Sequence, residues 1–200
     1  IGFVRLRREV QLARRVTHPN VCRLFDIGWH QVGDDPGGTL FITMEFLDGE
    51  TLSSHLRHTG PLCMADALPI ARQLTAALGA AHEAGVVHRD FKTANVMLMP
   101  SEGLREASGV RVVVTDFGLA RHGAAEDSEG PSITEAGVAV GTPATMAPVQ
   151  LQGGKISAAT DLYALGVIAY EAIFRCVPYA PSAALDLLSG AGVEPASFVA

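Results

Sequence analysis

One stretch of the sequence, VVHRDFKTAN at residues 86–95, determines how the other segments are interpreted. It brings a carboxylate, an ammonium group and a carboxamide close together, those of Asp90, Lys92 and Asn95. Phosphoryl transfer requires mainly an aligned nucleophile and neutralisation of phosphate charge by metal ions and cations. Asp90 can orient an attacking hydroxyl, Lys92 can offset charge on the transferred group, and Asn95 can bind magnesium through its amide oxygen. The stretch therefore predicts phosphoryl-transfer chemistry.

A second acidic residue follows an apolar run further along the chain. Residues 110–115 are expected to form a strand, and Asp116-Phe117-Gly118 comes directly after it. Asp116 would be the anionic ligand of the same metal ion. An isolated Asp-Phe-Gly is usually a turn in which glycine supplies a positive φ, so the functional interpretation depends on its combination with residues 86–95.

Hydrophobic periodicity predicts a mixed α and β chain whose second half is mostly helical. Thr51 is expected to cap a short helix, and Pro69 to delay the regular part of a longer one. Residues 121–139 are small, polar and acidic without a usable period, which predicts a mobile surface segment. The expected helices are residues 3–16, 64–82 and 157–174, and the expected strands are 21–28, 40–44, 96–99 and 110–115.

Composition limits the classes of partner and compartment. The chain has 200 residues, 48% of them hydrophobic, and a net charge of −6 without long runs of one sign, so no nucleic-acid partner is predicted. Three distant cysteines without a CxxC pair favour a reducing, cytoplasmic setting. The most apolar segment, 162–174, is too short to span a membrane, and a membrane tether outside these residues is left open.

The motifs resemble those of a known family. His88-Arg89-Asp90 with Asn95, and Asp116-Phe117-Gly118, are similar to the catalytic loop and magnesium-binding motif of eukaryotic-type protein kinases. Lys92, two residues past the aspartate, resembles the serine/threonine class, and the composition resembles bacterial members. The resemblance covers nearly the whole chain, which lacks counterparts of both ends of the family's domain.

The fold implied by this resemblance is α+β and two-lobed. A partial small lobe, made of helix C and the strands that follow it, would precede a mostly helical large lobe. Residues 1–47 would be the remainder of the small lobe with the hinge, and residues 48–200 an incomplete large lobe.

The resemblance also implies nucleotide-binding residues before the loop. Glu9 falls where the family has its helix-C glutamate, a structural or regulatory role. The lysine that would pair with it has no counterpart here, so an ordinary solvated charge is left open as the alternative. Met44 resembles the gatekeeper. Glu45 and Leu47 belong to the hinge whose backbone groups hydrogen-bond adenine, and Asp116 would contact the nucleotide through the metal.

Further roles concern the support of the loop and its regulation. By resemblance, Asp161 holds the catalytic loop, Thr142 contacts Asp90 and Lys92 and favours Ser/Thr substrates, and His88 is a packed structural histidine.

Regulation by phosphate is the last implied feature. Arg89 would meet a phosphate on the activation segment, because phosphate on a flexible segment can order it by pairing with arginine. Ser132 and Thr134 are the expected phosphorylation sites.

Two functions remain open from the sequence. The first is a protein serine/threonine kinase core that uses ATP and Mg²⁺ to phosphorylate Ser/Thr hydroxyls of protein substrates. The second is an inactive pseudokinase or degenerate fragment acting as a binding module. A Gly-rich loop and strand-three lysine are absent ahead of Glu9, and Ala147-Pro148-Val149 stands where the family has Ala-Pro-Glu.

Overall fold

The computed structural model describes residues 2–31, 38–100, 109–117 and 145–179, with side chains from residue 7 onward. In chain order the elements are α1 Gly2–Ala13, β1 Leu24–Gln31, β2 Gly38–Met44, β3 Glu50–Thr51, α2 Leu52–Thr59, α3 Met64–Glu83, the 3₁₀ turn η1 Thr93–Asn95, β4 Val96–Pro100, β5 Val110–Val114, α4 Pro148–Leu151 and α5 Ala158–Phe174. The predicted α+β composition is present.

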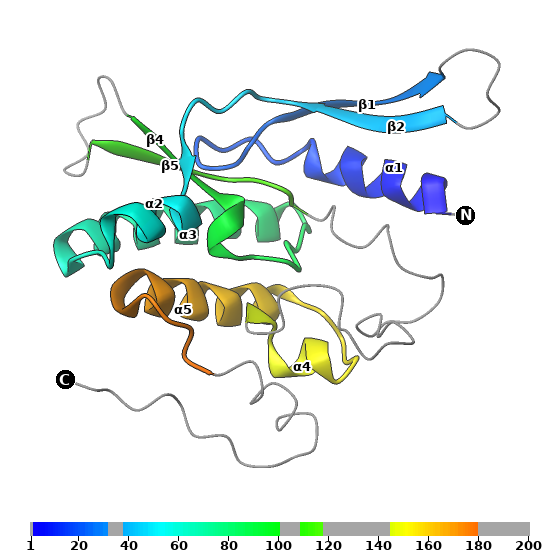
Figure 1. Ribbon diagram of the computed structural model, residues 1–200. Helices are drawn as coiled ribbons and strands as arrows, with labels where there is room; N and C mark the ends of the chain where they lie inside the picture. The colour runs from blue at the N-terminus through cyan, green and yellow to red at the C-terminus, as the bar shows by residue number, and fades with distance from the viewer. Residues whose placement is uncertain (1, 32–37, 101–108, 118–144, 180–200) are drawn as a thin grey trace.

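The described strands form one antiparallel pair, β1–β2, and one antiparallel three-stranded sheet in the order β3-β4-β5. Figure 1 shows α1 alongside the β1–β2 pair, and α3 and α5 stacked against each other in the other part of the molecule. A parallel bridge between Val21 and Val114 joins the segment before β1 to β5.

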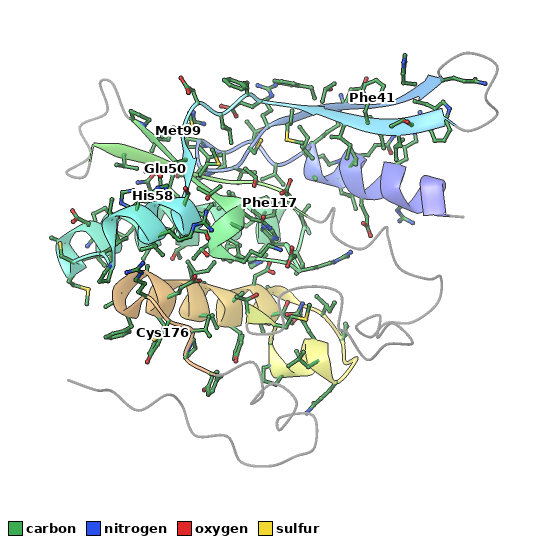
Figure 2. The ribbon with its side chains drawn as sticks, in the orientation of Figure 1. Phe41, Glu50, His58, Met99, Phe117 and Cys176 are labelled. Carbon is green, nitrogen blue, oxygen red and sulfur yellow. The ribbon has the colours of Figure 1, made fainter. Side chains whose placement is uncertain are left out.

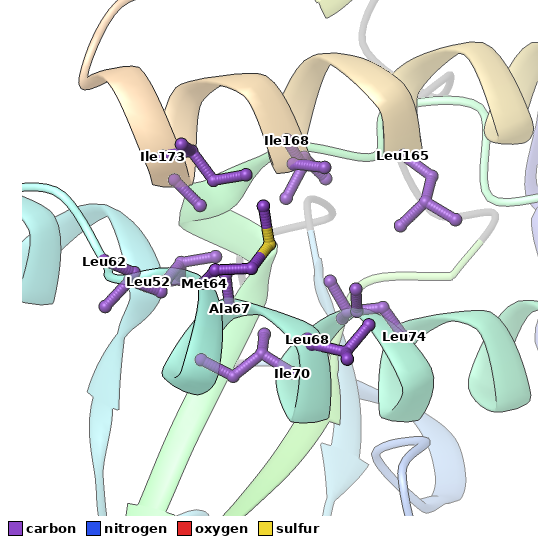
Figure 3. A pocket seen from close by; sticks show the side chains of 13 residues that line it. Leu52, Leu62, Met64, Ala67, Leu68, Ile70, Leu74, Leu165, Ile168 and Ile173 are labelled. Carbon is purple, nitrogen blue, oxygen red and sulfur yellow. The ribbon is translucent and has the colours of Figure 1, made fainter.

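The main core lies between α3, α5 and the three-stranded sheet. Leu74 and Leu78 on α3 and Ile168 on α5 are at most 2% exposed, and Val96 and Val112 from the strands are fully buried. Burial of each such aliphatic side chain stabilises the fold by roughly 1.5–3 kcal/mol. The two helices leave an apolar pocket of about 90 Å³ at one end, and Figure 3 shows the side chains that line it.

Several predicted boundaries differ from the observed ones. The strand expected at 21–28 begins at Leu24. The residues before it pair with β5 instead: the Cys22 N–H donates to the Val114 carbonyl, and the Val114 N–H donates to the Asn20 carbonyl. Pro69 does not delay the long helix, which is helical from Met64.

Other local predictions hold, or fall outside the described residues. Thr51 caps α2 as expected, since its Oγ1 accepts a hydrogen bond from the Ser54 N–H at 3.1 Å. The segment 121–139 lies outside the described residues.

Gln73 ties three parts of the fold together from the middle of α3. Its Oε1 accepts hydrogen bonds from Asn20 Nδ2 and the Val112 N–H, both at 2.8 Å, and its Nε2 donates to the Val110 carbonyl at 3.0 Å. The Gln73 side chain is 8% exposed. The loop before β1, helix α3 and strand β5 therefore share one buried amide.

Replacing Gln73 by leucine is expected to lower the free energy of unfolding by about 2–3 kcal/mol, because the buried Val112 N–H loses its acceptor. Urea unfolding of the full-length protein measures the change. The matched control is Gln11→Leu on the exposed surface of α1, for which we expect little effect. Equal stability of the two variants would contradict this role of Gln73.

Candidate active site

The start of the 86–95 loop is held by a buried carboxylate from α5. Asp161, 1% exposed, accepts hydrogen bonds from the backbone N–H groups of His88 and Arg89 at 2.8 and 3.0 Å. His82 at the end of α3 contacts the same carboxylate through Nε2 at 2.7 Å. Both backbone donors thus have a fixed acceptor, which orients the loop relative to α5.

His88 is buried beneath the loop and serves as a packing residue. The centroid of its ring lies 5.1 Å from that of Phe91 and 4.7 Å from that of Phe117. Phe117 is labelled in Figure 2. Nε2 lies 2.9 Å from the Thr115 carbonyl, a contact that requires the proton on Nε2. Burial lowers the pKa of His88, and a neutral, hydrogen-bonded ring is the result.

The polar residues predicted to carry the chemistry come together on this loop. Lys92 Nζ lies 2.6 Å from Asp90 Oδ2, and Asn95 Nδ2 donates to the Asp90 carbonyl at 2.9 Å. The Asp90 and Lys92 side chains are about one quarter exposed, so both are accessible. One face of the loop therefore presents a carboxylate and an ammonium group side by side.

Asp116 directly follows Thr115, which is hydrogen-bonded to Asn95. The N–H and Oγ1 of Thr115 donate to the Asn95 carbonyl at 2.9 and 3.3 Å. The Asp116 side chain is exposed. The carboxylate and the carboxamide predicted as metal ligands are thus on adjoining segments.

Two residues of the site have an unusual backbone. Arg89 has a φ of 72° and Asp116 a φ of 61°, in the left-handed region that side-chain-bearing residues rarely adopt. Such a conformation costs about 1 kcal/mol or more per residue. At Arg89, hydrogen bonds of its N–H to Asp161 and of its carbonyl to Gln150 hold the conformation in place.

Of the two alternatives left open for Glu9, the ordinary solvated charge is wrong. Its Oε1 lies 3.1 Å from Arg89 Nη1, and its side chain is only 15% exposed. This ion pair connects α1 directly to the loop. The arginine of the loop itself is thus a partner of Glu9.

The predicted hinge follows β2. Met44 is the last residue of β2, Leu47 is partly buried, and the Glu45 N–H donates to the Arg23 carbonyl at 2.8 Å. The Glu45 carboxylate lies 3.3 Å from Arg111 Nη2 on β5. The hinge is therefore attached to both sheets.

A buried thiol lies against the hinge. Cys22 Sγ contacts the Glu45 carbonyl at 3.8 Å, and burial raises the pKa of Cys22 to about 11. The thiol is therefore protonated at neutral pH, and thiolate chemistry is not expected at this position.

Four predicted site residues, Gly118, Ser132, Thr134 and Thr142, lie outside the described residues. Conversely, sequence reasoning did not assign the supporting contacts of His82, Arg111 and Gln150. Gln150 on α4 donates from Nε2 to the Arg89 carbonyl at 2.8 Å. Each of these is a polar residue next to an apolar run, a pattern too common to identify a partner far away in the sequence.

Comparison with known proteins identifies the family. The sequence-family model of the protein kinase domain matches residues 4–189 of this chain. The chain is 38% identical over 181 residues to the serine/threonine-protein kinase pkn3 of Myxococcus xanthus, covering 90% of this chain and 31% of that protein. It is 36% identical over 183 residues to PknA of Mycobacterium tuberculosis, covering 92% and 39%. The chain belongs to the protein kinase family and spans about a third of the length of these relatives.

Solved structures agree on the fold. A crystal structure of the PknI kinase domain of Mycobacterium tuberculosis superposes with a TM-score of 0.63 at 24% identity, covering 90% of this chain and 60% of that one. A structure of Rad53 in complex with AMP-PNP gives 0.64 at 23% identity, covering 88% and 39%. The expected kinase-type fold is confirmed. Among the described residues, no helix combines the length and apolar character needed to cross a membrane.

Proposed function

We propose that this chain is the core of a protein serine/threonine kinase that transfers the γ-phosphoryl group of ATP to Ser/Thr hydroxyls of protein substrates. The observation that carries the proposal is the 2.6 Å pair of Asp90 and Lys92 on a loop fixed by Asp161. Asp90 would accept the hydrogen bond of the substrate hydroxyl and orient its oxygen, and Lys92 would offset charge on the transferred phosphoryl group.

The residues beside this pair fit a magnesium ion. Because Nδ2 of Asn95 is engaged with the Asp90 carbonyl, its Oδ1 is the atom suited to a cation. The exposed Asp116 follows Thr115, which is hydrogen-bonded to Asn95. Oxygen ligands of this type suit Mg²⁺, which usually keeps several waters and binds substrate phosphates as well. When bound, the ion would neutralise charge on the phosphates of ATP.

The nucleotide would lie between this site and the hinge. Met44 is the proposed gatekeeper, and Glu45 and Leu47 would hydrogen-bond adenine through their backbone. The AMP-PNP bound to Rad53 supports ATP as the nucleotide, and the names of the bacterial relatives support a Ser/Thr acceptor.

The domain layout and the regulatory sites belong to the same proposal. Residues 1–47 would be the small-lobe remainder with the hinge, and residues 48–200 the large-lobe part. Thr142 would favour the Ser/Thr acceptor, and Ser132 and Thr134 would be the phosphorylation sites.

The test is transfer of labelled phosphate from ATP to a generic basic protein by the full-length protein. We expect transfer with Mg²⁺, none after chelation by EDTA, and recovery when Mg²⁺ is restored. Asp116→Asn is expected to lose transfer, because a neutral amide binds Mg²⁺ more weakly than a carboxylate. Asp66→Asn, the same change on the exposed surface of α3, should leave it unchanged.

Two outcomes would contradict the proposal. Phosphate transfer by Asp116→Asn at the wild-type rate would contradict the assignment of Asp116 as a metal ligand. Binding of ATP by a wild-type protein that transfers no phosphate with Mg²⁺ would favour a nucleotide-binding pseudokinase instead.

A further inference from the structure

Helix α5 has an unusual distribution of charge. Its 17 residues include only two charged side chains, Asp161 near the start and Glu171 near the end. Asp161 holds the backbone of His88 and Arg89 at the beginning of the loop. Glu171 contacts the same loop near its end, through the hydroxyl of Thr93.

The contact at the end of the loop is partly buried. Thr93 Oγ1 donates to Glu171 Oε2 at 3.2 Å, and the Thr93 residue is 4% exposed. Burial raises the pKa of Glu171, and the hydrogen bond from Thr93 opposes this shift. Glu171 is thus one of the two charged side chains on α5, and both of them contact the loop.

Thr93 is well placed to influence the reacting groups. It begins the turn η1, directly after Lys92, and the Asn95 N–H closes that turn by donating to the Lys92 carbonyl at 2.9 Å. A shift of Thr93 would therefore move both Lys92 and Asn95 relative to Asp90. Misplacement of catalytic groups by even 1 Å can cost a hundredfold in rate, at the order-of-magnitude level.

We propose that Thr93 and Glu171 are positioning residues for phosphoryl transfer, in which the Glu171 carboxylate holds the Thr93 hydroxyl and so fixes the end of the loop that carries Lys92 and Asn95. This inference rests on the proposed kinase function. With Asp161 at the other end, α5 holds the loop at two points through its two carboxylates.

The experiment compares Thr93→Val, Thr93→Ser, Glu171→Met and the double variant Thr93→Val/Glu171→Met in the full-length protein. Thr93→Val should lower kcat about tenfold or more, because it removes a hydrogen bond to a charged group. KM for ATP should not change, because the substitution does not affect the hinge. Thr93→Ser keeps the hydroxyl, so its kcat should be close to that of the wild type. The double variant should be no slower than the slower single variant, since both changes remove the same contact.

Matched controls separate this role from general destabilisation. Thr75→Val and Glu83→Met make the same changes on exposed positions of α3 and should leave kcat unchanged. Wild-type kcat in Thr93→Val would overturn the proposal. So would failure of serine to restore the rate, or additive losses in the double variant.

Amide hydrogen exchange distinguishes failure of this inference from failure of the kinase function. If the wild type transfers no phosphate, the kinase proposal fails, yet the contact is still tested. Thr93→Val should then speed exchange of the Asn95 N–H about tenfold or more relative to Thr75→Val. Unchanged exchange at Asn95 would overturn the positioning role independently of activity.

Discussion

Replacing Asp90 by asparagine is expected to lower kcat for phosphoryl transfer by about 10²- to 10⁴-fold, the range for loss of a positioned proton acceptor. Asparagine has nearly the same shape, so the loop should remain folded. What changes is the charge beside Lys92 Nζ, 2.6 Å from Asp90 Oδ2, and the ability to accept the hydroxyl proton. KM for ATP should change little, because Asp90 acts on the acceptor hydroxyl.

Steady-state kinetics with labelled ATP measures this effect in the full-length protein. Asp66→Asn on α3 is the control, since it makes the same chemical change at an exposed position. A circular dichroism spectrum identical to that of the wild type would exclude unfolding as the cause. If Asp90→Asn retained a kcat within a few-fold of wild type, Asp90 would not be the residue that orients the nucleophile.

Replacing Asp161 by alanine is expected to have the largest effect on stability. The backbone N–H groups of His88 and Arg89 would lose their acceptor, and His82 would lose its partner, in a site where Asp161 is 1% exposed. Leaving buried donors unsatisfied costs roughly 1–3 kcal/mol each, so we expect a loss of about 3–5 kcal/mol in the free energy of unfolding.

Urea unfolding of the full-length protein tests this expectation. Asp161→Asn should fall between wild type and Asp161→Ala, because its remaining carbonyl oxygen can accept one of the two backbone hydrogen bonds. Asp66→Ala serves as the exposed control. A loss of less than about 1 kcal/mol in Asp161→Ala would show that water or another group replaces the carboxylate readily.

The sequence was sufficient to predict the fold class and the residues of the loop. Helix α3 was located to within a residue or two from its apolar period, and α5 from the length of its nearly continuous apolar run. The loop could be identified because its polar residues lie within one short segment. The likeness to the kinase family then placed Asp116 and Asp161 near it.

Contacts between distant segments could not be predicted in the same way. The start of β1 was misplaced because the bridge from Val21 to Val114 is set by tertiary packing, which residue patterns do not record. Glu9 was left between a helix-C glutamate and an ordinary solvated charge, because its pairing with Arg89 depends on how α1 packs near the loop. Thr93 and Glu171 are 78 residues apart, and neither residue alone indicates the other.

The left-handed backbone at Arg89 and Asp116 has a consequence for how this chain can evolve. At Asp116, glycine would relieve conformational strain while removing the proposed metal ligand, so selection for stability alone does not retain this side chain. At Arg89, glycine would relieve the same kind of strain but would also remove the ion pair with Glu9. In a set of related sequences, glycine at position 116 would therefore mark lineages in which catalysis is no longer under selection.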